Sequence, residues 1–334
     1  MKLFSLNQTN TPYANLEPDL ILNAVESMGF HCTGSLFPLN SYENRVYQIG
    51  IEDAEPLIAK FYRPCRWTDE AIIEEHQFAL ELVRHEIPVI APLAISSGDT
   101  LHTYQDFRFS LFPRKGGRAL ELDNLEQLEW MGRFIGRLHA VGACQPFRHR
   151  IKLDTKNYGY EPYHFLVEHN FIPNELKHNF CDITETVLQK IEQRFLQVGQ
   201  IDYIRLHGDC HAGNVLWNSF GPHIVDLDDC LMGPAIQDIW MLLSGSKHDT
   251  DLQLNYILRG YLEFHDFNFR ELQLIEAMRS LRMMHYSSWL AKRWEDPAFP
   301  LNFPWFNTAH YWQNQLQNLR DQADLLDLDY DYSF

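Results

Sequence analysis

The chain has 334 residues, which is enough to form two lobes that each have their own hydrophobic core. Its 45 acidic and 28 basic residues give a formal net charge of −17, so we expect no binding to nucleic acid or to an anionic membrane. No long apolar run occurs, and Met1 to Asn10 lacks a basic and then apolar signal pattern, so a cytoplasmic protein is expected. The six cysteines are scattered without a Cys-x-x-Cys pair, and disulfides are not implied.

The first part of the chain predicts a small antiparallel sheet. Apolar residues at helical spacing from Leu20 to Met28 predict a short helix that ends at Gly29. Residues 68–84 carry apolar side chains on one helical face and predict one long helix. Strands are predicted at residues 30–37, 45–51 and 57–62, and at 101–104 and 107–112 as a hairpin around Gln105 and Asp106. Residues 1–112 are therefore expected to form a sheet lobe.

Residues 113–334 predict a larger and mainly helical lobe. The stretch from Asp123 to Glu126 has the pattern of a capping box, and apolar residues from Leu125 to Leu138 form a stripe that ends at Gly142. A second stripe runs from Leu176 to Phe195 and is closed by Gly199. The predicted fold class is α+β with two lobes, one a small sheet with one long helix and the other mainly helical.

The most informative segment lies between short strands of this second lobe. Strands are predicted at residues 203–206, 215–217 and 223–227, with a turn at 218–221. The loop after the first of them reads His207-Gly208-Asp209-Cys210-His211-Ala212-Gly213-Asn214. A hairpin formed by the next two strands would return Asp226 to a place beside Asn214.

These residue types suit phosphoryl transfer from a magnesium nucleotide. Such a transfer needs a carboxylate that accepts or orients the acceptor's hydroxyl proton, and metal ions that bridge the phosphates. Asp209 is the candidate base. Asn214 and Asp226 offer the hard oxygen ligands that Mg²⁺ prefers, and Asp226 is counted as a catalytic residue as well. The segment therefore predicts an ATP-dependent kinase.

Two other interpretations of the same segment stay open. One is an ordinary turn with incidental polar residues. The other is a zinc site formed by His207, Cys210 and His211, which would need a second cysteine or histidine cluster that the sequence does not provide.

The catalytic segment resembles a known superfamily. His207-x-Asp209, Asn214 and Val225-Asp226 are similar to the motif of the aminoglycoside phosphotransferase and choline kinase superfamily, which has a protein-kinase-like fold. Residues 40–47 and 206–216 resemble bacterial stress response kinases that act on Ser and Thr of proteins, and the similarity runs from about residue 16 to residue 305. The resemblance implies ATP as co-substrate, Mg²⁺ as cofactor, a structural role for His207 and an ability to autophosphorylate.

Three further residues gain a role from this resemblance. Ser41 lies where a kinase holds its glycine-rich phosphate loop, and its hydroxyl and nearby backbone N–H groups can donate to phosphate, although a plain hairpin turn is the alternative. Lys60 ends an apolar strand, as does the kinase lysine that pairs with the α and β phosphates, and the alternative is an edge-strand lysine. Glu75 on the following helix fits as the partner of Lys60, and Glu74 is the other possibility.

Several later residues carry weaker predictions. Asp238 is expected to accept hydrogen bonds from the backbone of the catalytic loop. The aromatic segment from His285 to Trp305 predicts a helical core with an aromatic lid, or else a cation–π cage for a quaternary ammonium. The acidic tail from Asp321 to Asp331 predicts a solvated end, or else an autoinhibitory or basic-partner contact.

Two functions follow from this sequence as hypotheses. The first is a monomeric Ser/Thr protein kinase that uses ATP and Mg²⁺. The second is a kinase for a small molecule such as choline, homoserine or an aminoglycoside. A nucleotide-binding scaffold without catalysis is a third class, but Lys60, Asp209, Asn214 and Asp226 are all present.

Overall fold

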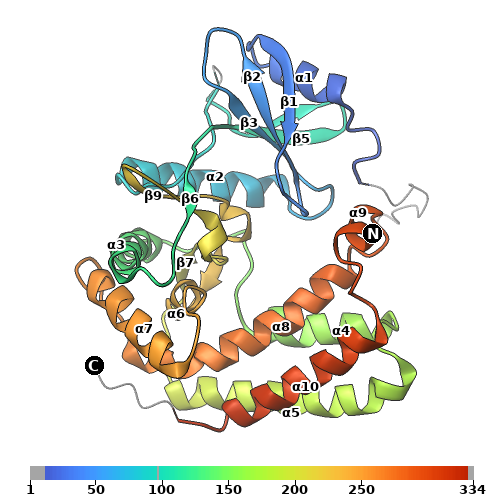
Figure 1. Ribbon diagram of the computed structural model, residues 1–334, viewed down its shortest axis with the longest axis vertical. Helices are drawn as coiled ribbons and strands as arrows, with labels where there is room; N and C mark the ends of the chain where they lie inside the picture. The colour runs from blue at the N-terminus through green and yellow to red at the C-terminus, as the bar shows by residue number, and fades with distance from the viewer. Residues whose placement is uncertain (1–11, 96–97, 330–334) are drawn as a thin grey trace. The chain divides into compact units, whose positions relative to one another are not determined.

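The computed structural model describes residues 12–95 and 98–329, and these form two compact units. Unit 1 contains the described residues of Met1–Asp69 and Pro92–Arg114 together with Trp289–Phe306 (Figure 1). Unit 2 contains Glu70–Ala91, Lys115–Ser288 and the described residues of Asn307–Phe334. The Met1 to Asn10 segment, which lacks a signal pattern in the sequence, lies outside the described residues.

Unit 1 is built on a five-stranded antiparallel sheet with the strand order β1-β2-β3-β5-β4. The strands are β1 (Cys32–Pro38), β2 (Arg45–Ile51), β3 (Leu57–Phe61), β4 (His102–Tyr104) and β5 (Phe107–Pro113). Helix α1 (Pro18–Glu26) buries Ile21, Ala24 and Val25 in the same apolar cluster as Ile49 and Phe109 of the sheet. The helix, the sheet and the β4–β5 hairpin confirm the sequence prediction for this region.

Unit 2 is mainly helical. Its long helices are α2 (Asp69–Arg84), α3 (Leu125–Gly142), α5 (Asn174–Val198), α7 (Lys247–Tyr261), α8 (Ile275–Ala291) and α10 (Ala309–Leu325). The shorter ones are α4 (Glu161–Glu168) and α6 (Ile236–Trp240), while α9 (Ala298–Asn302) belongs to unit 1. The predicted α+β class, with a small antiparallel sheet and a larger helical part, is confirmed. No helix in the described part of the chain is long and apolar enough to cross a membrane.

Two short sheets in unit 2 hold the catalytic segment. Strand β7 (Ile204–Leu206) pairs with β10 (Leu231–Gly233), and β8 (Val215–Asn218) lies between β6 (Arg118–Ala119) and β9 (Gly221–Ile224). The predicted strand at 223–227 is wrong in its second half. It ends at Ile224 because Asp226 has a left-handed backbone (φ 62°), after which residues 227–229 form a single 3-10 turn.

The start of α3 also differs from its prediction. A capping box over Asp123 to Glu126 was expected, but Asn124 is the N-cap and its side chain accepts a hydrogen bond from Gln127 N. The Gln127 side chain in turn accepts from Glu121 N rather than from the capping residue. The helix therefore begins one residue later than the box predicts, with a single capping bond.

The acidic tail contacts basic residues of its own chain. Asp327 forms an ion pair with Lys190 (2.5 Å), and Asp329 forms one with Arg194 (2.7 Å), both on α5. Asp331 lies outside the described residues. Both carboxylates stay exposed, at 63% and 91%, so the described part of the tail is solvated as predicted and also forms surface ion pairs with α5.

Candidate active site

The carboxylate of Asp238 on α6 binds the backbone of the loop that follows β7. One carboxylate oxygen accepts a hydrogen bond from His207 N and the other from Gly208 N, both at 2.8 Å. The predicted bracing role of Asp238 is confirmed. His207 contributes as well, since its Nε2 contacts Val225 O at 2.9 Å and its Nδ1 accepts from Asp209 N at 3.3 Å.

A second set of buried side chains fixes Asp238 itself. His139 of α3 contacts Asp238 Oδ2 through Nε2 (3.1 Å) and Tyr261 of α7 through Nδ1 (2.9 Å). His139 and Tyr261 are fully buried, and Asp238 nearly so. Buried polar groups that are all partnered make a rigid network, so the catalytic loop is positioned by two helices as well as by its own strands.

Gly208 is required by the path of the loop. Its φ is +85°, and a Cβ at this position would lie 2.2 Å from Asp229 O. Any other residue would be strained in this conformation and would collide with the backbone that follows Asp226. The glycine therefore lets the Asp209 loop and the Asp226 segment approach each other.

The electrostatic surroundings keep Asp209 ionised. Its two carboxylate oxygens contact Arg282 Nη1 of α8 at 2.7 Å and His211 Nε2 at 3.4 Å. Burial opposes ionisation, but the hydrogen bond from His211 and the guanidinium charge of Arg282 outweigh it and hold the pKa of Asp209 well below its usual range. Sequence reasoning missed Arg282, because no local pattern links it to a loop 73 positions earlier.

The hairpin of β8 and β9 brings Asn214 and the Asp226 segment together. Val215 pairs with Ile224 in the register of the hairpin, and Val225 N donates to Asn214 O at 3.0 Å. The Asn214 side chain donates through Nδ2 to Asp209 O (2.9 Å), which turns its Oδ1 to the opposite side of the amide. The three residues named from the sequence thus share one corner of unit 2.

Arg150 is a site residue that the sequence did not reveal. Its buried guanidinium contacts Glu75 Oε2 of α2 (3.0 Å), Asp228 O (2.9 Å) and Cys230 Sγ (3.3 Å). Burial opposes its charge, yet these partners raise the pKa of Arg150 above its usual value. Arg150 therefore ties the helix that carries Glu75 to the segment directly after Asp226.

The two glutamates that the sequence offers as partners of Lys60 have different surroundings. Both carboxylate oxygens of Glu74 accept hydrogen bonds from backbone N–H groups of residues 148–150, at 2.6 to 3.1 Å. Glu75 is buried and ion-paired with Arg150. Glu74 is thus held by a loop of its own unit, and Glu75 by the guanidinium of Arg150.

In unit 1, Lys60 lies on β3 and Ser41 lies in the loop between β1 and β2. Lys60 pairs with Ser110 in the β3–β5 register and is buried, with its ammonium 5.3 Å from the centre of the Tyr62 ring. It is therefore not an edge-strand lysine, because β3 has a neighbour on each side. The Ser41 hydroxyl donates to Asn44 O at 2.5 Å and closes the loop between β1 and β2.

The donor set of the site suits a hard cation. Asn214 and Asp226 offer oxygen ligands, and Mg²⁺ binds proteins through few such groups while nucleotide oxygens and water complete its shell. Among the residues that the structure describes, no group of three or more His, Cys, Asp or Glu side chains is arranged to hold a metal. His207 Nε2 contacts Val225 O. His211 contacts Asp209 through Nε2 and accepts a hydrogen bond from Gly213 N through Nδ1. Cys210 is fully buried.

The aromatic side chains of this segment in unit 1 contact arginine residues of the same chain. Trp289 packs against Phe299 and Phe303, with ring centres 5.1 and 5.8 Å apart. The guanidinium of Arg293 lies 5.1 Å from the Trp289 ring, and that of Arg63 lies 5.3 Å from Phe299. Arginine side chains thus contact the ring faces that a quaternary ammonium would need. These contacts favour the predicted aromatic core over the predicted cation–π cage.

Comparison with known proteins agrees with this geometry. A model of the phosphotransferase enzyme family matches residues 36–275. The chain belongs to this family. Stress response kinase A of Escherichia coli O157:H7 is 45% identical over 321 residues, covering 96% of this chain and 97% of that protein. The serine/threonine protein kinase RdoA of Salmonella typhimurium strain LT2 is 44% identical over 323 residues, with the same coverage. This phosphotransferase is therefore an ATP-dependent kinase.

Solved structures show that the fold of this phosphotransferase is shared widely. The amicoumacin kinase hAmiN, in complex with AMP-PNP and Ca²⁺, has a TM-score of 0.71 at 21% identity, with 92% of this chain and 94% of that chain covered. A microcompartment-associated aminopropanol kinase has a TM-score of 0.67 at 16% identity, with 91% and 96% covered. At such low identity the likeness concerns the fold alone.

Proposed function

We propose that the protein is a Ser/Thr protein kinase that transfers the γ-phosphate of Mg-ATP to hydroxyl groups of proteins, including its own. The proposal is carried by one observation, the Asp209 carboxylate that contacts Arg282 and His211 in a braced loop beside Asn214 and Asp226. The Ser/Thr acceptor is supported by RdoA, which is named a serine/threonine protein kinase and matches almost the entire chain.

Asp209 is assigned to the acceptor hydroxyl. The reaction breaks the bond between the γ-phosphorus of ATP and the oxygen that bridges it to the β-phosphorus, which leaves with ADP, and it forms a bond from the acceptor oxygen to the γ-phosphorus. The hydroxyl proton passes to Asp209 and then to solvent. Because the pKa of Asp209 is low, its carboxylate is a weak base that chiefly orients the hydroxyl and takes the proton late in the transfer.

Asn214 and Asp226 are assigned to the metal. Asn214 Oδ1 and the Asp226 carboxylate would hold Mg²⁺, which neutralises charge on the phosphates when bound. The left-handed backbone of Asp226 turns the chain out of the β9 direction directly after the hairpin. Such strained conformations in non-glycine residues occur preferentially at functional sites.

The remaining nucleotide contacts are assigned to the sheet unit and to α2. Ser41 and the backbone of its loop would contact phosphate oxygens, and Lys60 would pair with the α and β phosphates. Glu75 would hold Lys60, and its contact with Arg150 would link this pair to the metal-binding segment.

We place the two lobes at residues 1–112 and 113–334. We place the protein in the cytoplasm, where its six free thiols remain reduced.

The test is transfer from γ-labelled ATP to protein and metabolite panels. We expect label on the protein itself and on Ser or Thr of a generic protein substrate such as casein, and loss of both in Asp209→Asn. Asp182→Asn, an exposed change on α5, is the matched control and should keep full activity. Turnover of choline, homoserine or an aminoglycoside without protein labelling would instead establish the small-molecule alternative.

A further inference from the structure

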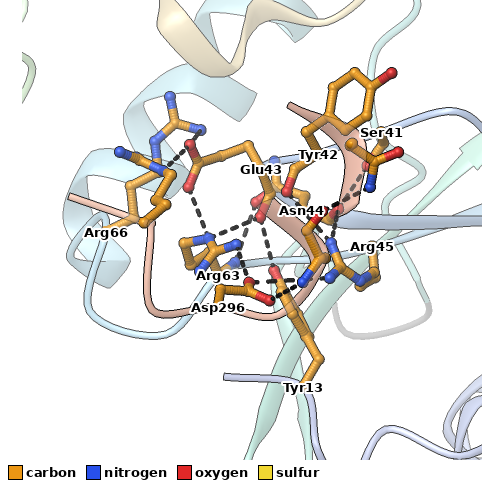
Figure 2. A network of polar contacts seen from close by, with 12 residues as sticks. Tyr13, Ser41, Tyr42, Glu43, Asn44, Arg45, Arg63, Arg66 and Asp296 are labelled. Carbon is orange, nitrogen blue, oxygen red and sulfur yellow. Dashed lines mark hydrogen bonds and ion pairs between the residues drawn. The ribbon is translucent and has the colours of Figure 1, made fainter. Parts of the chain in front are cut away.

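The loop at Ser41 contains no glycine, yet side chains from two distant parts of unit 1 hold it. Glu43 is central, and its carboxylate lies among guanidinium groups as shown in Figure 2. We use the term loop clamp for the set of Glu43, Arg63, Trp289, Arg293 and Asp296. The last three come from the end of α8 and the segment after it, about 250 positions beyond the loop.

Glu43 makes short contacts with both parts of the clamp. Its Oε2 accepts a hydrogen bond from Trp289 Nε1 at 2.6 Å and lies 2.6 Å from Arg293 Nε. Its Oε1 lies 2.9 Å from Arg63 Nε. The glutamate side chain is only 13% exposed, so these charge-assisted contacts are little screened by solvent.

Arg63 extends the clamp to the backbone of the loop. Its Nε also donates to Glu43 O (3.0 Å), and its backbone N donates to Asn44 Oδ1 (3.1 Å). Its Nη2 contacts Asp296 Oδ2 at 2.7 Å. Ser41 Oγ donates to Asn44 O, and Tyr42 O accepts from Arg45 Nη1 at 3.3 Å, so each residue from Ser41 to Asn44 is held by a polar contact. The Tyr42 ring packs on Phe303, with centres 4.9 Å apart.

The charge balance makes Glu43 the critical member. The cluster combines two carboxylates, Glu43 and Asp296, with four guanidinium groups, those of Arg45, Arg63, Arg66 and Arg293. The pKa of Arg293 is lowered by burial, and the charges of Arg66 and Arg63 add to this effect while Glu43 opposes it. Without the Glu43 charge, like-charged arginines would repel one another directly beneath the loop.

We propose that Glu43, through the loop clamp, is the positioning residue that presets the Ser41 loop for the phosphates of ATP. The inference rests on the proposed function of this loop in ATP binding. A glycine-rich loop must be ordered when the nucleotide binds, whereas a loop fixed in advance avoids that entropic cost. The segment Trp289–Phe306 thereby contributes to nucleotide affinity without itself touching the nucleotide.

The test compares steady-state kinetics of Glu43→Gln with those of the unchanged protein. We expect the KM for ATP to rise roughly tenfold, the size of effect that the loss of a charge-assisted contact gives, while kcat stays within about threefold. Glu55→Gln, an exposed change in the β2–β3 connection of the same unit, is the matched control and should alter neither constant. Backbone hydrogen exchange in residues 39–44, without nucleotide, should be faster in Glu43→Gln only.

Two milder variants keep the test informative if Glu43→Gln folds poorly. Trp289→Phe removes one donor to Glu43 but keeps the ring that packs on Phe299, and Glu43→Asp keeps the charge. Both should fold and should raise the KM for ATP by less than Glu43→Gln does. A lowered melting temperature with an unchanged KM for ATP in all three variants would overturn the clamp proposal.

Ser41→Ala together with Ser41→Pro separates failure of the clamp from failure of the loop assignment. If these two raise the KM for ATP and the Glu43 variants do not, the loop binds ATP and the clamp inference is wrong. If none of them changes the KM while Asp209→Asn still abolishes transfer, the assignment of the Ser41 loop is wrong as well.

Discussion

Asp209 and Asp238 have the same side chain but different surroundings, and these surroundings decide what each can do. Asp238 is 1% exposed and its oxygens accept two backbone N–H bonds and contact His139, so it has no capacity left for a substrate. Asp209 is 22% exposed and is held by Arg282 and His211, whose side chains are themselves 41% and 40% exposed. An acceptor hydroxyl can therefore approach Asp209 but not Asp238.

Asp209→Asn and Asp226→Ala should fail in different ways. The first removes the proposed base, so kcat should fall by at least about a hundredfold, in the range typical for general base loss, while Mg-ATP binding persists. The second removes a proposed metal ligand, so Mg-ATP binding should weaken as well. Equilibrium binding of a fluorescent ATP analogue together with single-turnover transfer measures both. Equal residual activity and equal nucleotide affinity in the two variants would contradict the assigned roles.

Arg282→Met should change the pH dependence of the reaction. Loss of the cation raises the pKa of Asp209, because Arg282 stabilises the ionised carboxylate. The base is active only when ionised, so the acid limb of the kcat/KM profile should move to higher pH. Arg279→Met, on the same helix but paired with Glu276, is the control and should leave the profile in place. An unmoved acid limb in Arg282→Met would show that Arg282 does not tune Asp209.

At the scale of elements, the packing of α3 on α7 positions the catalytic loop. A Cβ on Gly132 of α3 would lie 1.9 Å from Ile257 O of α7, and a Cβ on Gly260 of α7 would lie 2.1 Å from Glu129 O of α3. The two helix backbones are therefore in direct contact. This closeness allows His139 of α3 and Tyr261 of α7 to meet at 2.9 Å and to support Asp238.

Gly132→Ala should force these helices apart. We expect a loss of about 1–3 kcal/mol in the free energy of unfolding, the usual cost of overpacking, and a lower kcat because the His139 network is displaced. Urea denaturation and steady-state assays measure the two effects. Gly116→Ala, where a Cβ meets nothing within 4 Å, serves as the control and should change stability by less than about 0.5 kcal/mol. A stable Gly132→Ala protein would mean that the contact between α3 and α7 is readily relaxed.

At the scale of the whole molecule, a buried carboxyl makes stability depend on pH. Glu271 accepts a hydrogen bond from Ile236 N at the start of α6, the helix that carries Asp238. Burial raises the pKa of Glu271 to about 7. Its folded-state pKa thus exceeds the unfolded value, so its contribution to stability is complete below about pH 4.5 and is lost as the pH rises through 7.

Glu271→Gln should remove this dependence. The amide oxygen can still accept from Ile236 N but does not titrate, so the variant should gain stability relative to the unchanged protein at pH 8 and not at pH 4.5. Melting temperatures measured by calorimetry between these pH values test it. Glu161→Gln on α4, an exposed position, should melt like the unchanged protein throughout. Parallel pH curves for Glu271→Gln and the unchanged protein would contradict the raised pKa.

The sequence alone determined the features that depend on neighbouring residues. The periodic stripes predicted α1, α2, α3 and α5, and the alternating runs predicted the five-stranded sheet. Asp209, Asn214 and Asp226 lie within 18 positions and are joined by one hairpin, so their proximity followed from local pairing. The left-handed backbone of Asp226 could not be foreseen from the sequence, so the strand through Asp226 was predicted too long.

Only the tertiary structure decided which distant residues surround that local motif. Arg282 beside Asp209, Arg150 beside Glu75, and Arg293 beside Glu43 each join residues 73 to 250 positions apart. The residues of such a pair carry no shared pattern, because their contact depends on how helices such as α8 pack after the whole chain has folded. The residues assigned to catalysis therefore lie in one short segment, whereas the charges that surround them depend on long-range packing.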